Sequence, residues 1–426
     1  MHKIIIVSPH FPPSNLAAVH RSRLFAQHLP ALGWRPIIVA VHEDYYEEEL
    51  DWNLVKLLPK DLRIEKVTAL KTKPIRLVGD IGIRGFWRMA RRIIKLCKNE
   101  KIDFLYIPIP SFYAALLGRF VNLFVKVKYG IDYIDPWVHV FKGSDRTFSR
   151  HWWSTKVSGW LEPIAVKNAK LITGVAQGYY QAVIDRNPHL KKQSLFAAMP
   201  YGGEENDHRL LKTLDLKPYL FQKKKDKVQL VYAGALLPKA FEPLDLICKT
   251  ISEHLDSFSN TEIIFIGSGT SPNDPGGYNV KPIAQKYGLW ENIIFEFPKR
   301  IPYLDVLVHL QAANGVFILG STEPHYTPSK VYQSILSEKP IFAVLHQEST
   351  AVEVIRKSNA GVVVAFDGEQ GLDTITGTFV SQYKIYLDQL QIFNPKDVDQ
   401  TEFACYSAYE VTKQLVEKLN QIISHP

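Results

Sequence analysis

Short apolar runs alternate with longer amphipathic segments along most of the chain, and this alternation restricts its fold more than any other feature. Residues 4–9 form such a run, a loop rich in proline and small residues follows, and residues 20–32 then carry apolar side chains at helical spacing up to Gly33. Runs of this length are typical of parallel strands that are buried on both faces. Strands that alternate with helices predict an α/β fold with parallel sheets and crossover helices.

The alternating pattern occurs twice, which predicts two Rossmann-like, doubly wound domains facing each other across a cleft. A chain of 426 residues also exceeds the size at which a single core stops growing. The predicted strands are residues 4–9, 35–41, 104–108, 127–134, 170–175, 228–232, 262–266, 293–297, 315–319, 340–344 and 361–365. The predicted helices are residues 20–32, 86–98, 112–124, 152–169, 243–255, 303–312, 329–337, 349–357 and 402–423.

A charged and irregular stretch that ends in a lysine-rich run at residues 223–227 separates the two halves. We therefore predict a first domain over residues 1–200, a linker over 201–227 and a second domain over 228–400. Residues 401–426 would hold a long amphipathic helix that packs back towards the first domain.

Composition and cysteine usage point to a soluble cytoplasmic enzyme. Hydrophobic residues make up 46% of the chain and charged residues 22%, and Cys97, Cys248 and Cys405 lie far apart without C-x-x-C spacing. This argues against a zinc site or a disulfide framework and fits a reducing compartment. The N-terminal run lacks the features of a signal peptide, and no stretch approaches the roughly 18 apolar residues of a membrane span. We expect a cytoplasmic protein, with the inner face of the plasma membrane as the alternative site.

The net charge of +8 is distributed unevenly, with +14 over residues 1–200 and −6 over residues 201–426. A basic surface suits nucleic acid, an anionic membrane or a phosphorylated substrate. Because no RNA- or DNA-binding motif accompanies the charge, we expect no nucleic-acid partner. Residues 84–98 interleave cations with Phe86 and Trp87, and Trp152, Trp153 and Trp160 follow, which is typical of peripheral contact with an anionic membrane. The alternative is an ordinary domain helix with a solvated charged face.

Ligands of such sheets bind beyond the carboxyl ends of the strands, so the candidate loops follow residues 9, 134, 233, 266, 297 and 319. The last loop contains the segment 323–330, which opens a predicted helix. Thr327, Ser329 and free backbone amides at that helix N-terminus would suit a diphosphate, and Lys330 would add a full charge. The alternative is that Thr327 to Ser329 form only a helix cap with Pro328 in the first turn.

Segments 234–239, 265–269, 297–302 and 328–340 together resemble the donor half of retaining glycosyltransferases of family 4. These enzymes have the two-Rossmann B-type (GT-B) fold, and the chain resembles a divergent subgroup linked to capsule and lipopolysaccharide sugars. The resemblance implies that Lys239, which follows Gly234, reaches the donor phosphates, although Ala235 replaces the family's arginine. It also implies that the main chain near Arg300 and Ile301 contacts the base.

The family usually carries two glutamates eight residues apart, and the second one faces the ribose. The second position corresponds to Gln333 and the first to His325, with Glu323 two residues away. Glutamine can hydrogen-bond a ribose hydroxyl but carries no charge, so the departure affects the catalytic detail more than the nucleotide site. The implied donor-binding residues are Gly234, Arg300, Ile301, Glu323, Thr327, Pro328, Ser329, Lys330 and Gln333.

The first half resembles the acceptor domain of the family through its loop at residues 12–15 and the helix that follows. Residues 132–137 lie beyond a strand end, where the family often places a catalytic Asp or His; Ile134 takes the place of the usual His. Asp135 and Lys239 are therefore the candidate catalytic residues, although a turn before Pro136 also accounts for Asp135. The implied acceptor-binding residues are Ser14, Asn15, Arg21, Asp132 and His139.

The implied activity is transfer of a hexose-type unit from a nucleoside-diphosphate sugar to a glycan or lipid-linked acceptor in cell-surface polysaccharide synthesis. No cofactor is expected, and the absence of a paired Asp-x-Asp motif argues against a required metal ion. Lys239 and Lys330 could instead stabilise the charge that builds on the leaving diphosphate. One alternative is a nucleotide-sugar 2-epimerase of the same fold. Another is a catalytically silent nucleotide-sugar-binding subunit, suggested by Ala235, Gln333 and Ile134.

Overall fold

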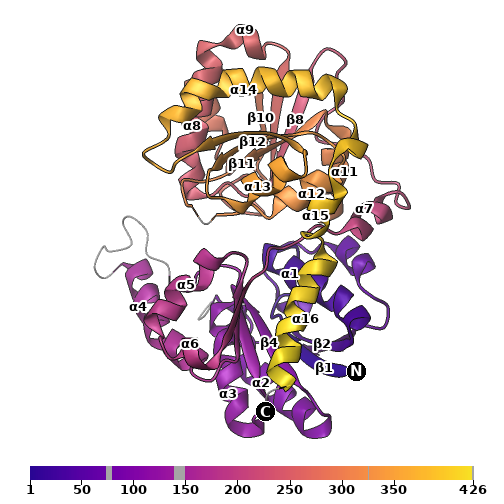
Figure 1. Ribbon diagram of the computed structural model, residues 1–426, viewed down its shortest axis with the longest axis vertical. Helices are drawn as coiled ribbons and strands as arrows, with labels where there is room; N and C mark the ends of the chain where they lie inside the picture. The colour runs from indigo at the N-terminus through magenta and orange to yellow at the C-terminus, as the bar shows by residue number, and fades with distance from the viewer. Residues whose placement is uncertain (73–78, 139–148, 325, 425–426) are drawn as a thin grey trace. The chain divides into compact units, whose positions relative to one another are not determined.

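The computed structural model describes residues 1–72, 79–138, 149–324 and 326–424, and it divides into two compact units (Figure 1). The first unit contains Met1–Tyr201 and Ala408–Pro426, and the second contains Gly202–Ser407. Each unit is built on one parallel sheet with helices packed on it. The predicted α/β class with two Rossmann-like sheets is therefore confirmed.

The sheet of the first unit has seven strands in the order β3-β2-β1-β4-β5-β6-β7. Its strands are β1 (His2–Val7), β2 (Trp34–Val41), β3 (Arg63–Val67), β4 (Phe104–Ile109), β5 (Tyr129–Tyr133), β6 (Leu171–Gly174) and β7 (Leu195–Ala198). Its helices are α1 (Ala17–His28), α2 (Ile81–Asn99), α3 (Leu116–Val125), α4 (Arg150–Val166), α5 (Gln177–Arg186), α6 (Leu190–Gln193) and α16 (Ala408–Ser424). Ile5 and Val7 join the core on the side of α2 and α3, whereas Ile4 and Ile6 join the core on the side of α1 and α16. The strand is apolar throughout because both faces of the sheet are covered.

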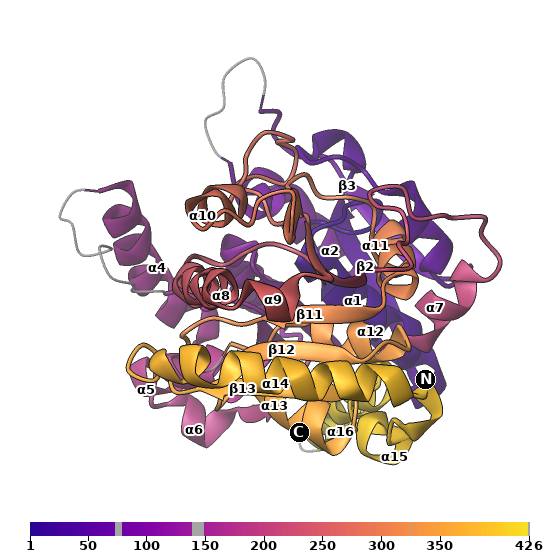
Figure 2. The ribbon, with the colours of Figure 1, turned by 90° about the horizontal axis from the view of Figure 1, so that it is seen from above.

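The sheet of the second unit has six strands in the order β10-β9-β8-β11-β12-β13. Its strands are β8 (Val228–Ala233), β9 (Thr261–Ile266), β10 (Ile294–Phe297), β11 (Gly315–Leu319), β12 (Ile341–His346) and β13 (Gly361–Phe366). Its helices are α7 (Glu205–Leu211), α8 (Phe241–Glu253), α9 (Leu255–Phe258), α10 (Lys281–Lys286), α11 (Tyr303–Ala312), α12 (Lys330–Leu336), α13 (Thr350–Lys357), α14 (Asp373–Ile392) and α15 (Gln400–Ala404). Figure 2 shows α14 running beside β12 and β13, against which it packs.

The single helix predicted over residues 402–423 is wrong, because the chain forms α15 and α16 with a break at Cys405–Ser407. In the break, the Tyr406 carbonyl accepts a hydrogen bond of 2.9 Å from the Gly203 amide. Phe403 of α15 is buried within the second unit, whereas Leu415 of α16 is buried within the first. The apolar pattern of the sequence continues across residues 405–407. The break between α15 and α16 is therefore visible only from the burial of the two helices in different units.

Several elements were absent from the sequence prediction. The stretch predicted as an irregular linker contains α7, and the edge strand β3 carries charged residues that mask its alternation. Helix α14 buries Ile375, Phe379 and Tyr383 at helical spacing, but it is rich in threonine and aromatic residues, which have only moderate helix propensity.

We expect the Leu415→Ala variant to destabilise the first unit by about 2–5 kcal/mol, because Leu415 is fully buried between α16 and the sheet. Urea unfolding followed by tryptophan fluorescence would measure the loss. Glu417→Ala, an exposed position on the same helix, is the matched control. An equal effect of the two variants would contradict the packing of α16 into this core.

Candidate functional site

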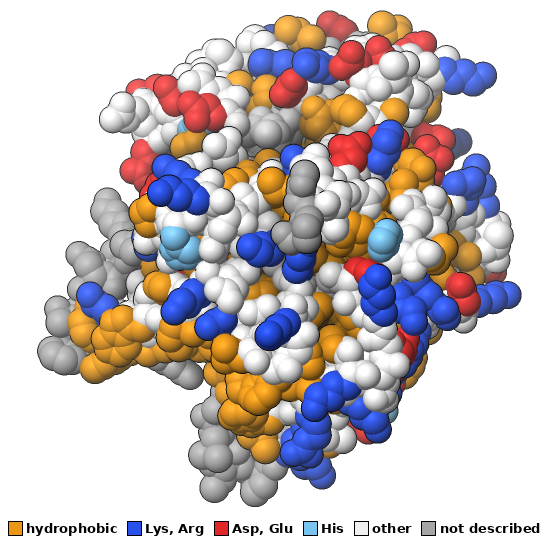
Figure 3. Space-filling model, turned by 60° about the horizontal axis from the view of Figure 1, so that its bottom comes forward, with side chains coloured by type: hydrophobic (Ala, Val, Ile, Leu, Met, Phe, Trp, Pro, Cys, Tyr) orange, Lys and Arg blue, Asp and Glu red, His pale blue; other side chains and the backbone are white. Residues whose placement is uncertain are grey.

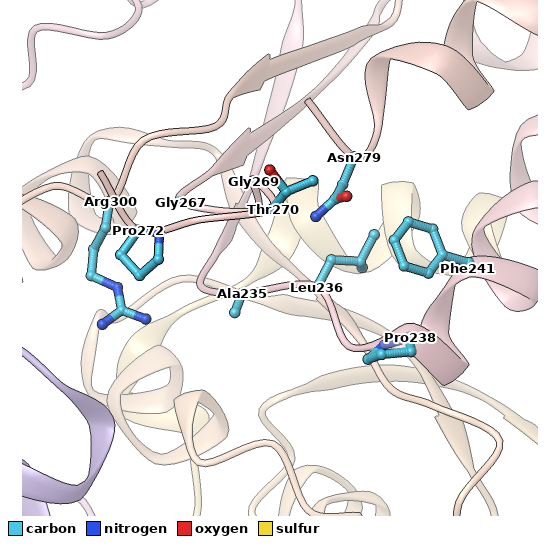
Figure 4. Close-up of a pocket in the computed structure, with 10 residues that line it drawn as sticks. All are labelled: Ala235, Leu236, Pro238, Phe241, Gly267, Gly269, Thr270, Pro272, Asn279 and Arg300. Atoms are coloured by element: carbon cyan, nitrogen blue, oxygen red, sulfur yellow. The ribbon is translucent and has the colours of Figure 1, made fainter. Parts of the chain in front are cut away.

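The order of strands in the second sheet reverses between β8 and β11, and the loops that leave the carboxyl ends of the strands at such a point are where ligands bind in open α/β sheets. A pocket of about 380 Å³ opens among the loops that follow β8, β9 and β10. This volume lies in the range of small-molecule sites. The pocket is lined by Ala235, Leu236, Pro238, Phe241, Gly267, Gly269, Thr270, Pro272, Asn279 and Arg300 (Figure 4). The predicted loops after residues 233, 266 and 297 therefore meet at one pocket.

The loop between β9 and α10 is held by the buried carboxylate of Glu296 from β10. This carboxylate accepts hydrogen bonds from the backbone amides of Asn279, Val280 and Lys281 at 2.9–3.1 Å, and from the Ser268 hydroxyl at 2.7 Å. The Asn279 side chain lines the pocket and donates to the Ser268 carbonyl at 2.8 Å. The polar wall of the pocket is thus fixed before any ligand binds.

Arg300 supplies the cationic side chain of the pocket and lies opposite Phe241 in Figure 4. The resemblance implied main-chain contact with the base here, but the Arg300 amide donates to the Pro272 carbonyl at 2.9 Å. Ile301 is buried next to it. The N–H group of Arg300 is therefore already bonded within the protein, and Arg300 is among the residues that line the pocket.

Lys330 places its amine nitrogen in the interior, at the point where the strand order reverses. Its Nζ lies 3.5 Å from the centroid of the Tyr232 ring, and a Cβ atom on Gly234 would lie 3.4 Å from it. Among the described residues this nitrogen has no hydrogen-bond partner. Burial lowers the pKa of Lys330 to about 7, so the group titrates near neutrality.

Gly234 connects Lys330 to the pocket, because the next residue, Ala235, lines it. Gly234 has a φ of 121° and Gly267 a φ of 69°, a backbone conformation that other residues rarely adopt. These two glycines allow the chain to turn sharply after β8 and β9.

Lys239 and Glu323 lie together at the same edge of the sheet. Their Nζ and Oε1 atoms are 3.8 Å apart, and the Lys239 carbonyl accepts a 3.2 Å hydrogen bond from the Thr322 amide. The Lys239 side chain is 41% exposed. The structure thus brings together two residues that the sequence predicted separately, and Glu323 offsets part of the Lys239 charge.

The remaining residues of the segment 323–330 are arranged differently from the prediction. The Thr327 hydroxyl is 2.7 Å from that of Thr350, Pro328 is buried, and Ser329 makes no side-chain capping bond. Helix α12 has only seven residues, so its N-terminal partial charge is small. The helix N-terminus alone therefore does not make an anion site. His325 lies outside the described residues.

Gln333 is held by His208 of α7, whose Nε2 atom lies 2.9 Å from its amide oxygen. Burial lowers the pKa of His208, which favours the neutral imidazole. The prediction did not include His208, because it is 125 residues away in the sequence and its stretch was assigned to the linker. Contact of Gln333 with a ribose would require it to share or leave this hydrogen bond.

In the first unit, Arg21 and Asp132 form a buried ion pair. The Arg21 Nε and Nη2 atoms donate to the Asp132 carboxylate at 2.8 and 3.0 Å, and Nη1 donates to the carbonyls of Met199 and Pro200. Burial opposes the charge, but Asp132 outweighs it and the pKa of Arg21 is raised. The Arg21 and Asp132 side chains are only 1% and 0% exposed. They therefore hold α1 and β5 in place and do not reach an acceptor.

Ser14 belongs to a polar cluster that the sequence analysis missed. Its hydroxyl donates to the Glu48 carboxylate, which also lies 2.9 Å from Nδ1 of His10. Burial disfavours the Glu48 charge, but His10 and Ser14 outweigh this effect and lower the pKa of Glu48 to about 2. Asn15 is half-buried beside the cluster, at the carboxyl end of β1 where the first sheet reverses its strand order.

The two candidates after β5 lie apart from this cluster in the sequence. Asp135 is exposed beyond β5. His139 lies outside the described residues.

Comparison with known proteins supports the fold at low sequence identity. No protein-family model and no curated protein matches the chain. Among solved structures, it is similar to sucrose-phosphate synthase from Thermosynechococcus elongatus (TM-score 0.65, 12% identity, 100% of each chain covered). It is also similar to Anabaena Alr3699/HepE in complex with UDP and glucose (TM-score 0.62, 15% identity, 99% of this chain and 100% of that chain). A candidate UDP-N-acetylglucosamine 2-epimerase from Listeria monocytogenes is a further neighbour (TM-score 0.53, 10% identity, 100% and 97% covered). The chain therefore has the glycosyltransferase-like GT-B fold.

We expect Lys330→Met to stabilise the second unit, and the gain to shrink as the pH rises from about 7 towards 10.5. Because the pKa is lowered only in the folded state, the unfolded chain binds the proton more tightly. The penalty on the folded state is complete below pH 7 and disappears above the ordinary pKa. Thermal unfolding over this pH range measures the difference, and the exposed Lys225→Met is the control. A gain in stability that does not depend on pH would contradict the burial of the Lys330 amine.

Proposed function

We propose that the chain is a glycosyltransferase that binds a nucleoside-diphosphate sugar at the pocket and Lys330. The observation that carries the proposal is the buried amine of Lys330, which has no hydrogen-bond partner in the described part of the chain. It lies at the reversal of strand order beside Gly234, and the next residue, Ala235, lines the pocket. A diphosphate would supply the missing counter-charge. The pocket beside Arg300 is large enough for the base and ribose.

The chemistry follows from the charge that develops as the sugar leaves the diphosphate. Lys330, in its protonated form, and Lys239 would stabilise the leaving oxygen. Lys330 begins α12, and Lys239 lies in the short 3-10 helix Pro238–Ala240 that precedes α8. Glu323, Thr327, Ser329 and Gln333 complete the proposed donor set. Asp135 is the proposed catalytic residue of the first unit.

The same proposal includes an acceptor site in the first unit. We assign it to the loops after β1 and β5 of the first unit, with Ser14, Asn15 and His139 as contacts. A glycan or lipid-linked acceptor in cell-surface polysaccharide synthesis suits the basic character of this half of the sequence. A lipid-linked acceptor would be met at a membrane surface.

The solved structures support a nucleotide-sugar-using enzyme of this fold. The Anabaena protein was solved in complex with UDP and glucose, which supports a UDP-sugar donor for the present pocket. The similarity to the Listeria epimerase makes an epimerase the second candidate. A catalytically silent binding subunit is the third.

We expect UDP binding at pH 8 to be accompanied by proton uptake, because the diphosphate raises the lowered pKa of Lys330. Titration calorimetry in two buffers of different ionisation enthalpy measures the protons taken up, and the affinity should rise as the pH falls from 9 to 7. Lys330→Met should abolish the proton uptake. Lys239→Ala should weaken UDP binding but leave the proton uptake unchanged. Absence of binding by UDP, GDP and other nucleoside diphosphates would refute the donor site.

Product analysis separates the transferase from the epimerase. Incubated with UDP-sugars alone, a transferase should leave the sugar unchanged or hydrolyse it slowly, and it should release UDP when a lipid-linked or glycan acceptor is added. Ser329→Trp, which fills the proposed donor site, should remove both UDP binding and turnover. Conversion of the sugar to its C2 epimer without an acceptor would overturn the transferase assignment.

A further inference from the structure

Large apolar side chains are exposed on α2, α3 and α4 of the first unit. They are Trp87 on α2, Leu123 and Phe124 on α3, and Trp153, Trp160 and Ile164 on α4, and they are 47–69% exposed. We call these six residues the aromatic face. Figure 3 shows hydrophobic side chains in a band on this side of the unit, with Lys and Arg side chains beside it.

The aromatic face is continuous and is not required by the core. The Trp87 and Phe124 rings both contact Phe120, at centroid distances of 5.3 and 5.1 Å. Helix α3 packs against both α2 and α4. On α4, Trp153 and Trp160 are seven residues apart and therefore lie on the same side of the helix. The opposite sides of these helices already supply core residues.

The charge beside the aromatic face is positive and has little compensation. Arg88, Arg91, Lys95 and Lys98 are exposed on α2, and Lys126, Lys156 and Lys167 are exposed on or next to α3 and α4. The sequences of the three helices contain a single acidic residue, Glu162. It is buried and paired with Arg186 at 2.9 Å. An anionic partner would therefore meet exposed cations on or next to each of the three helices.

We propose that the aromatic face docks the first unit on the surface of an anionic lipid bilayer. Tryptophan rings favour the level of the lipid headgroups, and lysine and arginine bind the anionic headgroups around them. Within the described ranges, every helix is too short or too polar to cross a bilayer. A protein partner would not need cations on all three helices. The docking would bring the proposed acceptor loops to a lipid-linked acceptor, and in this sense it rests on the proposed function.

This surface differs from the one predicted from the sequence. The predicted stretch at residues 84–98 includes Ile93 and Leu96, but both are buried in the core. Of that stretch, Trp87 is the one large apolar side chain that is exposed. Helix α3, which was predicted from the sequence but not assigned to this surface, contributes two of the six residues.

Sedimentation of the full chain with vesicles of phosphatidylcholine, with and without phosphatidylglycerol, tests the proposal. We expect binding only with phosphatidylglycerol and a decrease at high salt. The variant Trp87→Ser/Phe124→Ser/Trp160→Ser should lower the partition coefficient more than tenfold. Arg88→Glu/Arg91→Glu/Lys95→Glu should lower it further, because each cation near an anionic surface contributes roughly fivefold.

Two matched variants of the first unit serve as controls. Trp52→Ser removes an equally exposed tryptophan outside the aromatic face, and Lys191→Glu/Lys192→Glu reverses two exposed cations elsewhere. Both should keep vesicle binding. Binding that is absent in the wild-type chain, or equal in the serine variant and Trp52→Ser, would overturn the proposal. Self-association of the wild-type chain that the serine variant abolishes, without vesicle binding, would assign the face to a second copy.

UDP titration of the same variants keeps the two proposals apart. The aromatic face lies wholly in the first unit and the donor pocket wholly in the second, so the serine variant should bind UDP like the wild type. Vesicle binding without UDP binding would refute the donor site alone. UDP binding without vesicle binding would refute the docking surface alone.

Discussion

Parallel pairing of the strands is the constraint on which both units depend. It requires a crossover after each strand, covers both faces of the sheet with helices and gathers all carboxyl ends of the strands at one edge. Where the strand order reverses, the loops leave in opposite directions and open a space between them. In the second sheet this point lies between β8 and β11, and Gly234 and Lys330 occupy it. In the first sheet it lies between β1 and β4, and the Ser14–Glu48–His10 cluster follows β1.

The two lysines of the candidate donor site differ in how their charge is stabilised. Lys239 is partly exposed and already faces Glu323, and such surface pairs contribute little to stability. Among the described residues, the Lys330 amine has no hydrogen-bond partner to replace the lost water, and the ring of Tyr232 lies against it. A buried unpaired charge costs several kcal/mol, so the folded chain lowers the pKa instead. The charge of Lys330, more than that of Lys239, therefore depends on what binds beside it.

The positive charge of the first half is divided between two environments that net charge does not distinguish. Near β3, cations are neutralised by neighbours: Arg63 and Arg92 pair with Glu65, and Lys66 pairs with Glu43. On α2, α3 and α4, the exposed cations surround apolar rings. The structure thus places exposed cations on helices where large apolar side chains are also exposed. This combination, rather than the total of +14, is what suits an anionic bilayer.

The sequence by itself determined the fold class, most of the strands and the loops that carry the candidate site, because apolar periodicity and chain punctuation are local properties. Strand Gly315–Leu319 and helix Tyr303–Ala312 have the predicted bounds, and the loops after residues 233, 266 and 297 line one pocket. Only the tertiary structure decided the states of the side chains. The burial of Lys330, the contact of Gln333 with His208 and the pairing of Arg21 with Asp132 each join residues that are far apart in the chain. Desolvation and long-range pairing depend on the neighbours that folding supplies, and the local pattern of residues carries no record of them.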